Sequence, residues 1–438
     1  MWPHIVSTST SDFAPVLLAK GLLPETGSML GVLRFLGGIF FLALASLTLL
    51  RPPTRLLWAA SVAATEWGYW LALGALVVLI PTRSNPRLGK LGALLTLCAI
   101  GLFVMPVVRA KQLNATLPPS LEARFGPVQR HRNDFAAPPR PEPVNLAELL
   151  NPADTPAVRY EERVFAAHDG QSLSLGIYRP AYVHGPVPVI LVIHGGSWRD
   201  GNRHDFGPFN AYLASRDYVV AAMDYRLAPR WRFPAARDDV LSALAYLKVY
   251  ASELNIDATR MALLGRAAGG QLALLAAYTA QEPAIRGVIS LYAPSDLRYE
   301  YEHPAPSKLT DTRAALEAYL GGPPGSGAED AYFAASPVNF VAASSPPSLL
   351  VHGARDPIVA LDEASRLEAK LRAVGAKHLL VRLPWATHLC DKSFGGPCGQ
   401  IVAYSVERFL DSVMRGPAAE PAASPKRPTI QAKKTKAP

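Results

Sequence analysis

The sequence predicts an α/β fold, an eight-stranded and mostly parallel sheet with helices on both faces, preceded by an all-α transmembrane segment. Strongly apolar stretches are concentrated before residue 110, and short β-branched runs alternate with helical patterns from about residue 159 onward. The 438 residues also exceed the length of one ordinary domain. They suit one domain of roughly 250–300 residues together with a smaller additional segment.

The apolar stretches predict a membrane anchor. Hydrophobic residues make up 50% of the chain and charged residues 18%, and residues 29–50, 56–81 and 88–108 each approach the ~20 residues that span a bilayer. We expect three transmembrane helices within 29–109, after an N-terminal segment at 1–28. A cleavable signal peptide is a single short apolar region, so the pattern favours a retained, multi-pass anchor.

Two ionisable residues lie inside the predicted spans, Arg34 in the first and Glu66 in the second. An ionisable group at that depth is costly unless it is paired. We therefore expect an interhelical pair that helps the bundle pack, with a functional intramembrane site as the alternative.

The loop charges do not decide the orientation of the anchor, because Lys and Arg are nearly balanced between its two sides. Cys390 and Cys398 lie eight residues apart in one Gly/Pro-containing loop, close enough to form a disulfide. A disulfide implies an oxidising compartment and therefore a periplasmic or extracellular domain. The alternative is two unconnected thiols in a cytoplasmic domain.

The net charge of +9 is spread over linkers and chain ends, without a basic patch interleaved with aromatic residues. This distribution argues against a nucleic-acid partner. Residues 110–154 are predicted to be a Pro-rich linker, and residues 416–438 a disordered basic tail that is solvated or contacts anionic lipid.

Residues 155–415 contain the elements of the sheet. The predicted strands are 160–165, 173–178, 187–193, 218–223, 261–264, 287–291, 348–351 and 378–382. The predicted helices are 206–215, 235–251, 268–280, 361–374 and 400–413. In such sheets the functional site lies beyond the C-terminal ends of the strands.

The motif His194-Gly195-Gly196-Ser197-Trp198 directly follows the strand VPVILVI. Two successive glycines allow the backbone N–H groups of Gly195 and Gly196 to converge on one point, as an oxyanion hole requires. Without further support, the same motif is also consistent with a tight turn after a buried strand.

A second motif, Gly265-Arg266-Ala267-Ala268-Gly269-Gly270, lies between a strand and a helix. It has the G-x-S-x-G pattern of a nucleophile elbow with Ala267 in place of the serine. The N–H of Ala268, at the start of the helix, is a further candidate oxyanion donor.

An acid and a base follow in the order that this fold uses. Asp356 in VHGARDPIV and His388 in PWATHLC each come just after a strand. His388 would take the proton of a nucleophile, and Asp356 would orient its imidazole. Either residue alone is more often an ordinary loop residue, but together with the elbow they indicate a catalytic site.

These motifs, with DYRLAP at 224–229 and FPAARDDV at 233–240, make residues 160–413 resemble the α/β-hydrolase esterase/lipase superfamily. The nearest branches are the hormone-sensitive-lipase-like and ferulic-esterase-like (BD-FAE-like) ones. The resemblance implies carboxylic-ester hydrolysis through an acyl-enzyme, with no metal or organic cofactor. It covers the α/β-hydrolase domain at 155–415 and not the membrane spans.

Ala267 has no nucleophilic atom, so the chain as written should bind an ester without hydrolysing it. One interpretation is an engineered replacement of serine that traps a bound ester, and another is a natural inactive relative that binds or scaffolds a partner. The intact His388, Asp356 and glycine motif favour the first. Acyl transfer to an acceptor other than water would use the same site.

The substrate is indicated only in outline. Residues 296–341 are a candidate cap over the pocket, or else a surface excursion. Trp198 and Tyr292 are candidate substrate-binding residues, together with Trp231, Tyr301 and Trp385. A short-chain acyl or acetyl ester is the simplest expectation, and the anchor adds lipid- or envelope-derived esters. The oligomeric state is not indicated.

Overall fold

The computed structural model describes residues 26–80, 86–128, 136–151, 157–168, 170–183, 185–306 and 309–415. Residues 158–383 form one eight-stranded sheet in the order β1-β2-β4-β3-β5-β6-β7-β8. Strands β3 to β8 run parallel to one another. At the edge of the sheet, β2 pairs antiparallel with β4, and β1 pairs antiparallel with β2. The predicted fold class is therefore confirmed.

The strand bounds extend most of the predicted ones by a few residues. They are β1 (Val158–His168), β2 (Gln171–Pro180), β3 (Val187–Ile193), β4 (Val219–Met223), β5 (Ile256–Arg266), β6 (Ile285–Leu291), β7 (Ser348–Gly353) and β8 (His378–Leu383). The central strands β3 and β4 are buried at every residue, as continuous apolar runs in a parallel sheet should be.

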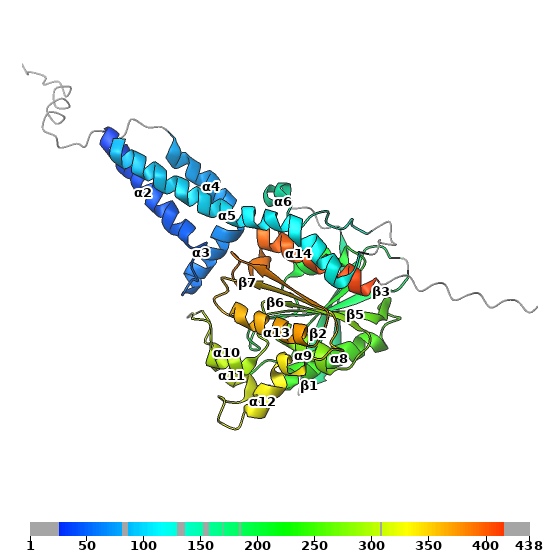
Figure 1. Ribbon diagram of the computed structural model, residues 1–438. Helices are drawn as coiled ribbons and strands as arrows, with labels where there is room; N and C mark the ends of the chain where they lie inside the picture. The colour runs from blue at the N-terminus through cyan, green and yellow to red at the C-terminus, as the bar shows by residue number, and fades with distance from the viewer. Residues whose placement is uncertain are drawn as a thin grey trace, which may run out of the picture.

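Helices cover both faces of the sheet (Figure 1). On one face lie α8 (Ala235–Val249), α9 (Ala268–Thr279) and α13 (Leu361–Ala373), and on the other lie α7 (Gly207–Ala214) and α14 (Pro397–Met414). Alternate residues of β3 serve the two cores. Val189, Leu191 and Ile193 face the first, whereas Ile190 and Val192 face the second, because strand side chains alternate sides.

The helical segment before this α/β domain differs from the three separate spans that were predicted. It comprises α2 (Thr26–Ser46), α3 (Arg55–Glu66), α4 (Gly68–Ala75), η2 (Leu76–Leu79) and α5 (Pro86–Phe125). Two helices, Met29–Ser46 and Arg87–Phe125, are long and apolar enough to cross a membrane. The second predicted span is wrong as one straight helix, because Arg55–Glu66 and Gly68–Leu79 are bent by 82° and form a span only if counted together.

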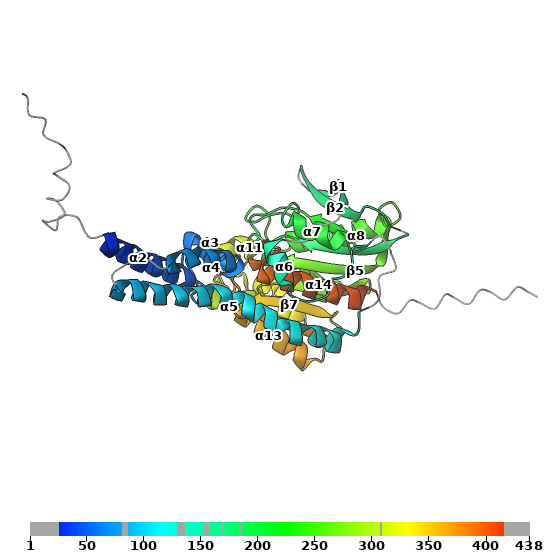
Figure 2. The same ribbon diagram turned by 90° about the horizontal axis from the view of Figure 1, so that it is seen from above.

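Helix α5 corrects the predicted linker, because it continues without a break to Phe125. Its C-terminal half lies on the α/β domain, where Leu117, Leu121 and Phe125 join the second core (Figure 2). The ring of Phe125 contacts that of Phe409 in α14, with centroids 4.8 Å apart. Residues 110–125 are thus part of the packed structure, and a short helix, α6 (Leu146–Leu150), follows later. The N-terminal residues 1–25 and the basic tail 416–438 lie outside the described residues.

The predicted pair between Arg34 and Glu66 is wrong. Arg34 Nη2 donates a hydrogen bond to the carbonyl oxygen of Leu79 at 3.2 Å. Glu66 is fully buried at the end of α3, where its Oε2 accepts from the backbone N–H of Cys398 at 2.9 Å. The bend after Glu66 directs this carboxylate toward the α/β domain, at the first turn of α14, instead of toward α2.

Candidate active site

The predicted elbow is a sharp turn between β5 and α9. Ala267 has φ 49° and ψ −120°, a backbone conformation that residues other than glycine rarely adopt. A Cβ on Gly265 would lie 2.0 Å from the Gly269 carbonyl oxygen, and one on Gly269 would lie 2.2 Å from that of His194. Glycine is therefore required on both sides of the turn, and the strained residue between them is Ala267.

The loop after β3 lies against the elbow, so the two motifs predicted to form an oxyanion hole meet. A Cβ on Gly195 would lie 3.4 Å from the Cβ of Ala267, and Gly196 has φ 113°. The His194 ring stacks on Tyr225 at 4.1 Å, and its Nδ1 lies 2.7 Å from the carbonyl oxygen of Gly195. Burial lowers the pKa of His194, which favours a neutral ring that holds the loop in place.

The acid and the base are hydrogen-bonded to each other. His388 Nδ1 lies 2.6 Å from Asp356 Oδ2, and both side chains are buried. Asp356 Oδ1 accepts from the N–H groups of Ile358 and Val359 at 2.8 and 2.9 Å. Burial alone would raise the pKa of Asp356, but His388 and His352 outweigh it and hold that pKa well below its usual value. The ionised carboxylate is therefore available to orient the His388 imidazole.

A second buried network lies behind His388. Arg266 Nε donates to Asp391 Oδ2 at 2.7 Å, and the Tyr292 hydroxyl donates to Asp391 Oδ1 at 2.6 Å. The Tyr292 ring lies 4.7 Å from the His388 ring. Arg266 and Asp391 were not predicted from the sequence as part of the site. Two features could have indicated them: Arg266 is a charged residue inside the elbow, and Asp391 follows Cys390 directly. The predicted disulfide between Cys390 and Cys398 is present.

A cavity of about 200 Å³ brings most of the predicted site residues together. It is lined by Gly195, Gly196, Trp198, Ala267, Ala268 and His388, and Thr312, Ala315 and Leu316 of the predicted cap form part of its wall. Trp198 stacks on Tyr319 at 4.5 Å and donates to Gln271 at 2.9 Å.

The other aromatic candidates do not line this cavity: Tyr292, Trp231, Tyr301 and Trp385. The Tyr292 hydroxyl is instead held by Asp391, and the Tyr292 ring packs against that of His388.

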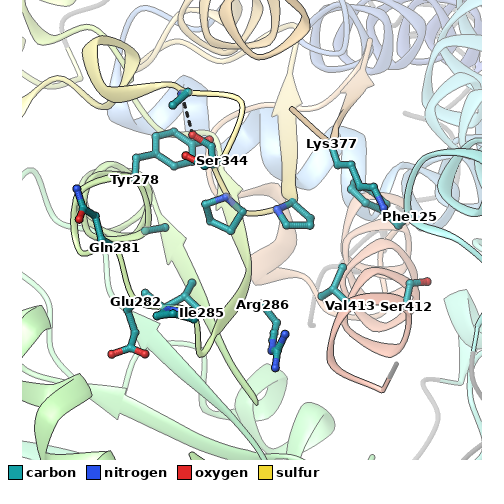
Figure 3. Close-up of a pocket in the computed structure, with 16 residues that line it drawn as sticks. Phe125, Tyr278, Gln281, Glu282, Ile285, Arg286, Ser344, Lys377, Ser412 and Val413 are labelled. Carbon is teal, nitrogen blue, oxygen red and sulfur yellow. Dashed lines mark hydrogen bonds between the residues drawn. The ribbon is translucent and has the colours of Figure 1, made fainter. Parts of the chain in front are cut away.

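A larger cavity, of about 610 Å³, lies at the opposite end of the sheet (Figure 3). Its lining includes Ile285 at the start of β6, Pro347 just before β7 and Lys377 just before β8, together with Phe125 of α5. It contains none of the predicted site residues. Because active sites in open α/β sheets lie beyond the C-terminal strand ends, the smaller cavity is the candidate active site. Among the described residues, no group of three or more His, Cys, Asp and Glu side chains is placed to hold a metal ion.

Comparisons with known proteins agree with this fold. Residues 175–371 match the model of the BD-FAE family. The chain is 29% identical over 249 residues to Esterase LipC of Mycobacterium tuberculosis, a match that covers 52% of this chain and 59% of LipC. The chain thus spans about three fifths of the length of that relative.

Two further matches extend the comparison. Esterase LipQ of the same organism is 25% identical over 382 residues, covering 82% of this chain and 85% of LipQ, which is more than residues 155–415 could supply. Among solved structures, a bacterial heroin esterase is 26% identical with a TM-score of 0.53, covering 62% of this chain and 89% of its own. The fold is that of the α/β-hydrolases, and the chain is similar in sequence to proteins named as esterases.

Proposed function

We propose that this chain is a membrane-anchored carboxylic-ester hydrolase scaffold of the serine type, whose missing nucleophile leaves it able to bind an ester but not to cleave it. The observation that carries the proposal is the shared cavity, in which Ala267 lies at the elbow beside His388 and the glycines of the HGG loop. Asp356 holds His388 from the opposite side at 2.6 Å.

The chemistry follows from what a serine at position 267 would do. Its hydroxyl oxygen would attack the ester carbonyl carbon while His388 Nε2 took the hydroxyl proton, with Asp356 stabilising the imidazolium. The N–H groups of Gly195, Gly196 and Ala268 would bind the developing oxyanion. His388 would then protonate the leaving alcohol, and water would release the acid from the acyl-enzyme. Ala267 removes the first of these steps and leaves the binding groups in place.

The membrane part of the proposal rests on where the helical segment contacts the α/β domain. Arg51 donates to the carbonyl oxygen of Ala354 at 3.3 Å, and Arg355 donates to that of Leu49. Both contacts adjoin Asp356, at the C-terminal ends of the strands. A multi-pass anchor there would place the cavity beside the bilayer, which favours lipid- or envelope-derived esters. The disulfide between Cys390 and Cys398 favours a periplasmic or extracellular domain.

The test is Ala267→Ser in the full chain, purified in detergent and assayed with p-nitrophenyl esters of increasing acyl length. The serine form is expected to exceed the alanine form by at least about 10³-fold, and His388→Ala in the serine form should remove that gain. The preferred acyl length would then report the size of the cavity. A folded serine form without activity on every ester would contradict the proposal.

Ala267 itself favours a second candidate, a natural binding protein built on an inactive hydrolase. Under that proposal the serine form stays inactive, while the chain as written binds its partner through the same cavity. Acyl transfer is distinguished by its products, because hydrolysis of the ester yields free acid and transfer yields a new ester or amide.

A further inference from the structure

Glu300 is a buried carboxyl group in the wall of the candidate active site that the mechanism does not use. It belongs to α10 (Leu297–Glu302), the first helix of the 296–341 segment, and it lines the same cavity as Ala267 and His388. The residue is 2% exposed, and neither of its carboxyl oxygens has a hydrogen-bond partner among the residues that the structure describes. A buried polar group without a partner destabilises the folded protein, because it has lost its hydrogen bonds to water.

The neighbouring carboxylates of Glu363 and Asp356 each have a partner on at least one oxygen, although Glu363 Oε1 has none among the described residues. Glu363 Oε2 accepts from the N–H groups of Ser295 and Asp296 at 2.7 and 2.8 Å, and Asp356 is held by His388. Burial, together with the charges of Glu363 and Asp356, raises the pKa of Glu300 well above its usual value. This shift, together with burial and the absence of a partner among the described residues, favours the neutral carboxylic acid form of Glu300.

A neutral carboxylic acid carries one donor and one acceptor side by side, which is the pattern that a hydroxyl group complements. Thr310 and Thr312 also line the cavity, as do the apolar residues Ala315, Leu316 and Val359. An ammonium group would instead require Glu300 to ionise beside Glu363 and Asp356, and a buried ion pair loses much of its attraction to desolvation.

We propose that Glu300 is a specificity-determining residue that selects esters carrying a hydroxyl group a few bonds from the ester, such as partial esters of polyols or esters of hydroxy acids. The inference rests on the proposed esterase function and narrows its substrate class. The substrate hydroxyl supplies the hydrogen bonds that the protein leaves unmade. A site built to bind a hydroxyl rejects the analogue that lacks one, because the protein group then stays buried without a partner.

The test compares matched esters on the Ala267→Ser chain. The pairs are ω-hydroxyalkyl acetates of two to four carbons against n-alkyl acetates of the same heavy-atom count, and methyl ω-hydroxyalkanoates against the corresponding methyl alkanoates. At least one hydroxyl ester should exceed its match in kcat/KM by about 10²-fold. Glu300→Leu should bring that ratio close to one, because the hydroxyl ester then loses its hydrogen-bonding partner in the cavity wall. Glu300→Gln, which keeps a donor and an acceptor, should retain most of the preference.

Two controls separate this role from a structural one. Glu302→Leu removes an exposed carboxylate of the same helix, which pairs with Arg298, and should leave the ratio unchanged. Glu300→Leu should raise the melting temperature, since it removes a buried polar group without a partner. Equilibrium binding of the same esters to the chain as written, with Ala267, provides a readout that needs no turnover, and the hydroxyl preference should appear there too.

The outcomes are distinguishable. If the serine form hydrolyses p-nitrophenyl and alkyl esters but shows no hydroxyl preference, or one that survives Glu300→Leu, the inference about Glu300 is overturned and the esterase proposal stands. If the serine form is inactive on all esters and the chain as written binds none of them, both fail. A preference for 2-(dimethylamino)ethyl acetate that disappears in Glu300→Gln would also overturn the inference, because it would assign the site to a cation.

Discussion

The α/β domain and the helical segment before it bury their charged groups in different ways. In the α/β domain, Asp356 has partners on both carboxylate oxygens, and Asp391 is held by Arg266 and Tyr292, all within the domain. In the helical segment, Glu66 is fully buried, and its Oε2 accepts from the backbone N–H of Cys398 in the other region, whereas its Oε1 has no partner within the described part of the chain.

The difference indicates which region is self-contained. Asp356 and Asp391 find their partners within the α/β domain, so we expect the geometry around His388 to depend little on α2 to α4. The helical segment obtains its position by docking, through Glu66 and the contacts of Arg51 and Arg355. Apolar side chains of this segment, such as Leu56, are exposed. Changes inside the α/β domain should therefore have the largest effects.

The largest expected effect is on the acid of the site. In the Ala267→Ser chain, Asp356→Asn should lower kcat by about 10⁴-fold, because the amide no longer holds His388 in the productive tautomer. Steady-state ester hydrolysis measures this directly. Asp362→Asn, at an exposed position in the first turn of α13, is the matched control and should retain full activity. A decrease of less than tenfold for Asp356→Asn would remove Asp356 from the site.

The elbow provides the next test. Gly265→Ala should lower the free energy of unfolding by about 3 kcal/mol or more, since the added Cβ would lie 2.0 Å from a backbone carbonyl that cannot move independently of α9. Gly207→Ala is the control, because its Cβ would lie no closer than 3.4 Å to the Tyr178 hydroxyl. Urea unfolding followed by tryptophan fluorescence compares the two. Equal stabilities would mean that the turn relaxes more easily than the structure indicates.

A pH-dependent effect is expected from Glu363. Burial raises the pKa of Glu363 to about 7, so the folded protein retains a proton that the unfolded chain releases at lower pH. The contribution of Glu363 to stability is therefore fully present below its ordinary pKa of 4.5 and is lost as the pH rises to about 7. Glu363→Gln should reduce this decline in melting temperature between pH 5 and pH 7, and an unchanged pH profile would contradict the assignment.

The smallest effect on the site is expected at Glu66. Glu66→Leu leaves the buried N–H of Cys398 without an acceptor, at a cost of about 1–3 kcal/mol to the docking of α3, whereas Glu66→Gln retains an acceptor. Hydrogen exchange at the Cys398 amide should become faster in the leucine variant. In the Ala267→Ser chain, ester hydrolysis by Glu66→Leu should stay within a few fold. A loss as large as that of Asp356→Asn would show that the α/β domain is not self-contained.

Much of the fold could be predicted because its determinants are local. The apolar run of β3 and the helical periodicity of the α/β domain predicted the bounds of these elements to within a few residues. Strand β5 was predicted less well, because it begins at Ile256, before the predicted start at residue 261. The glycines around Ala267 and the HGG loop predicted two backbone turns. Their meeting in one cavity followed from parallel strands ending at the same edge. The roles of the aromatic residues were harder to predict, because Trp198 and Tyr292 both have large aromatic side chains. Their hydrogen-bond partners in the folded protein distinguish Trp198, which lines the cavity, from Tyr292, which is buried beside His388.

The sequence by itself determined the sheet, the order of the motifs and the absence of a hydroxyl at position 267, because each depends on neighbouring residues or on the identity of one side chain. Only the tertiary structure decided where α3 bends, how far α5 extends over the second core, and which groups satisfy Glu66, Asp391 and Glu300. These depend on contacts between residues far apart in the chain. The neighbouring sequence does not show which partner a buried carboxyl group will have. It does not distinguish Glu66, which accepts from a distant backbone N–H, from Asp391, which pairs with a distant arginine, or from Glu300, which has no partner among the described residues.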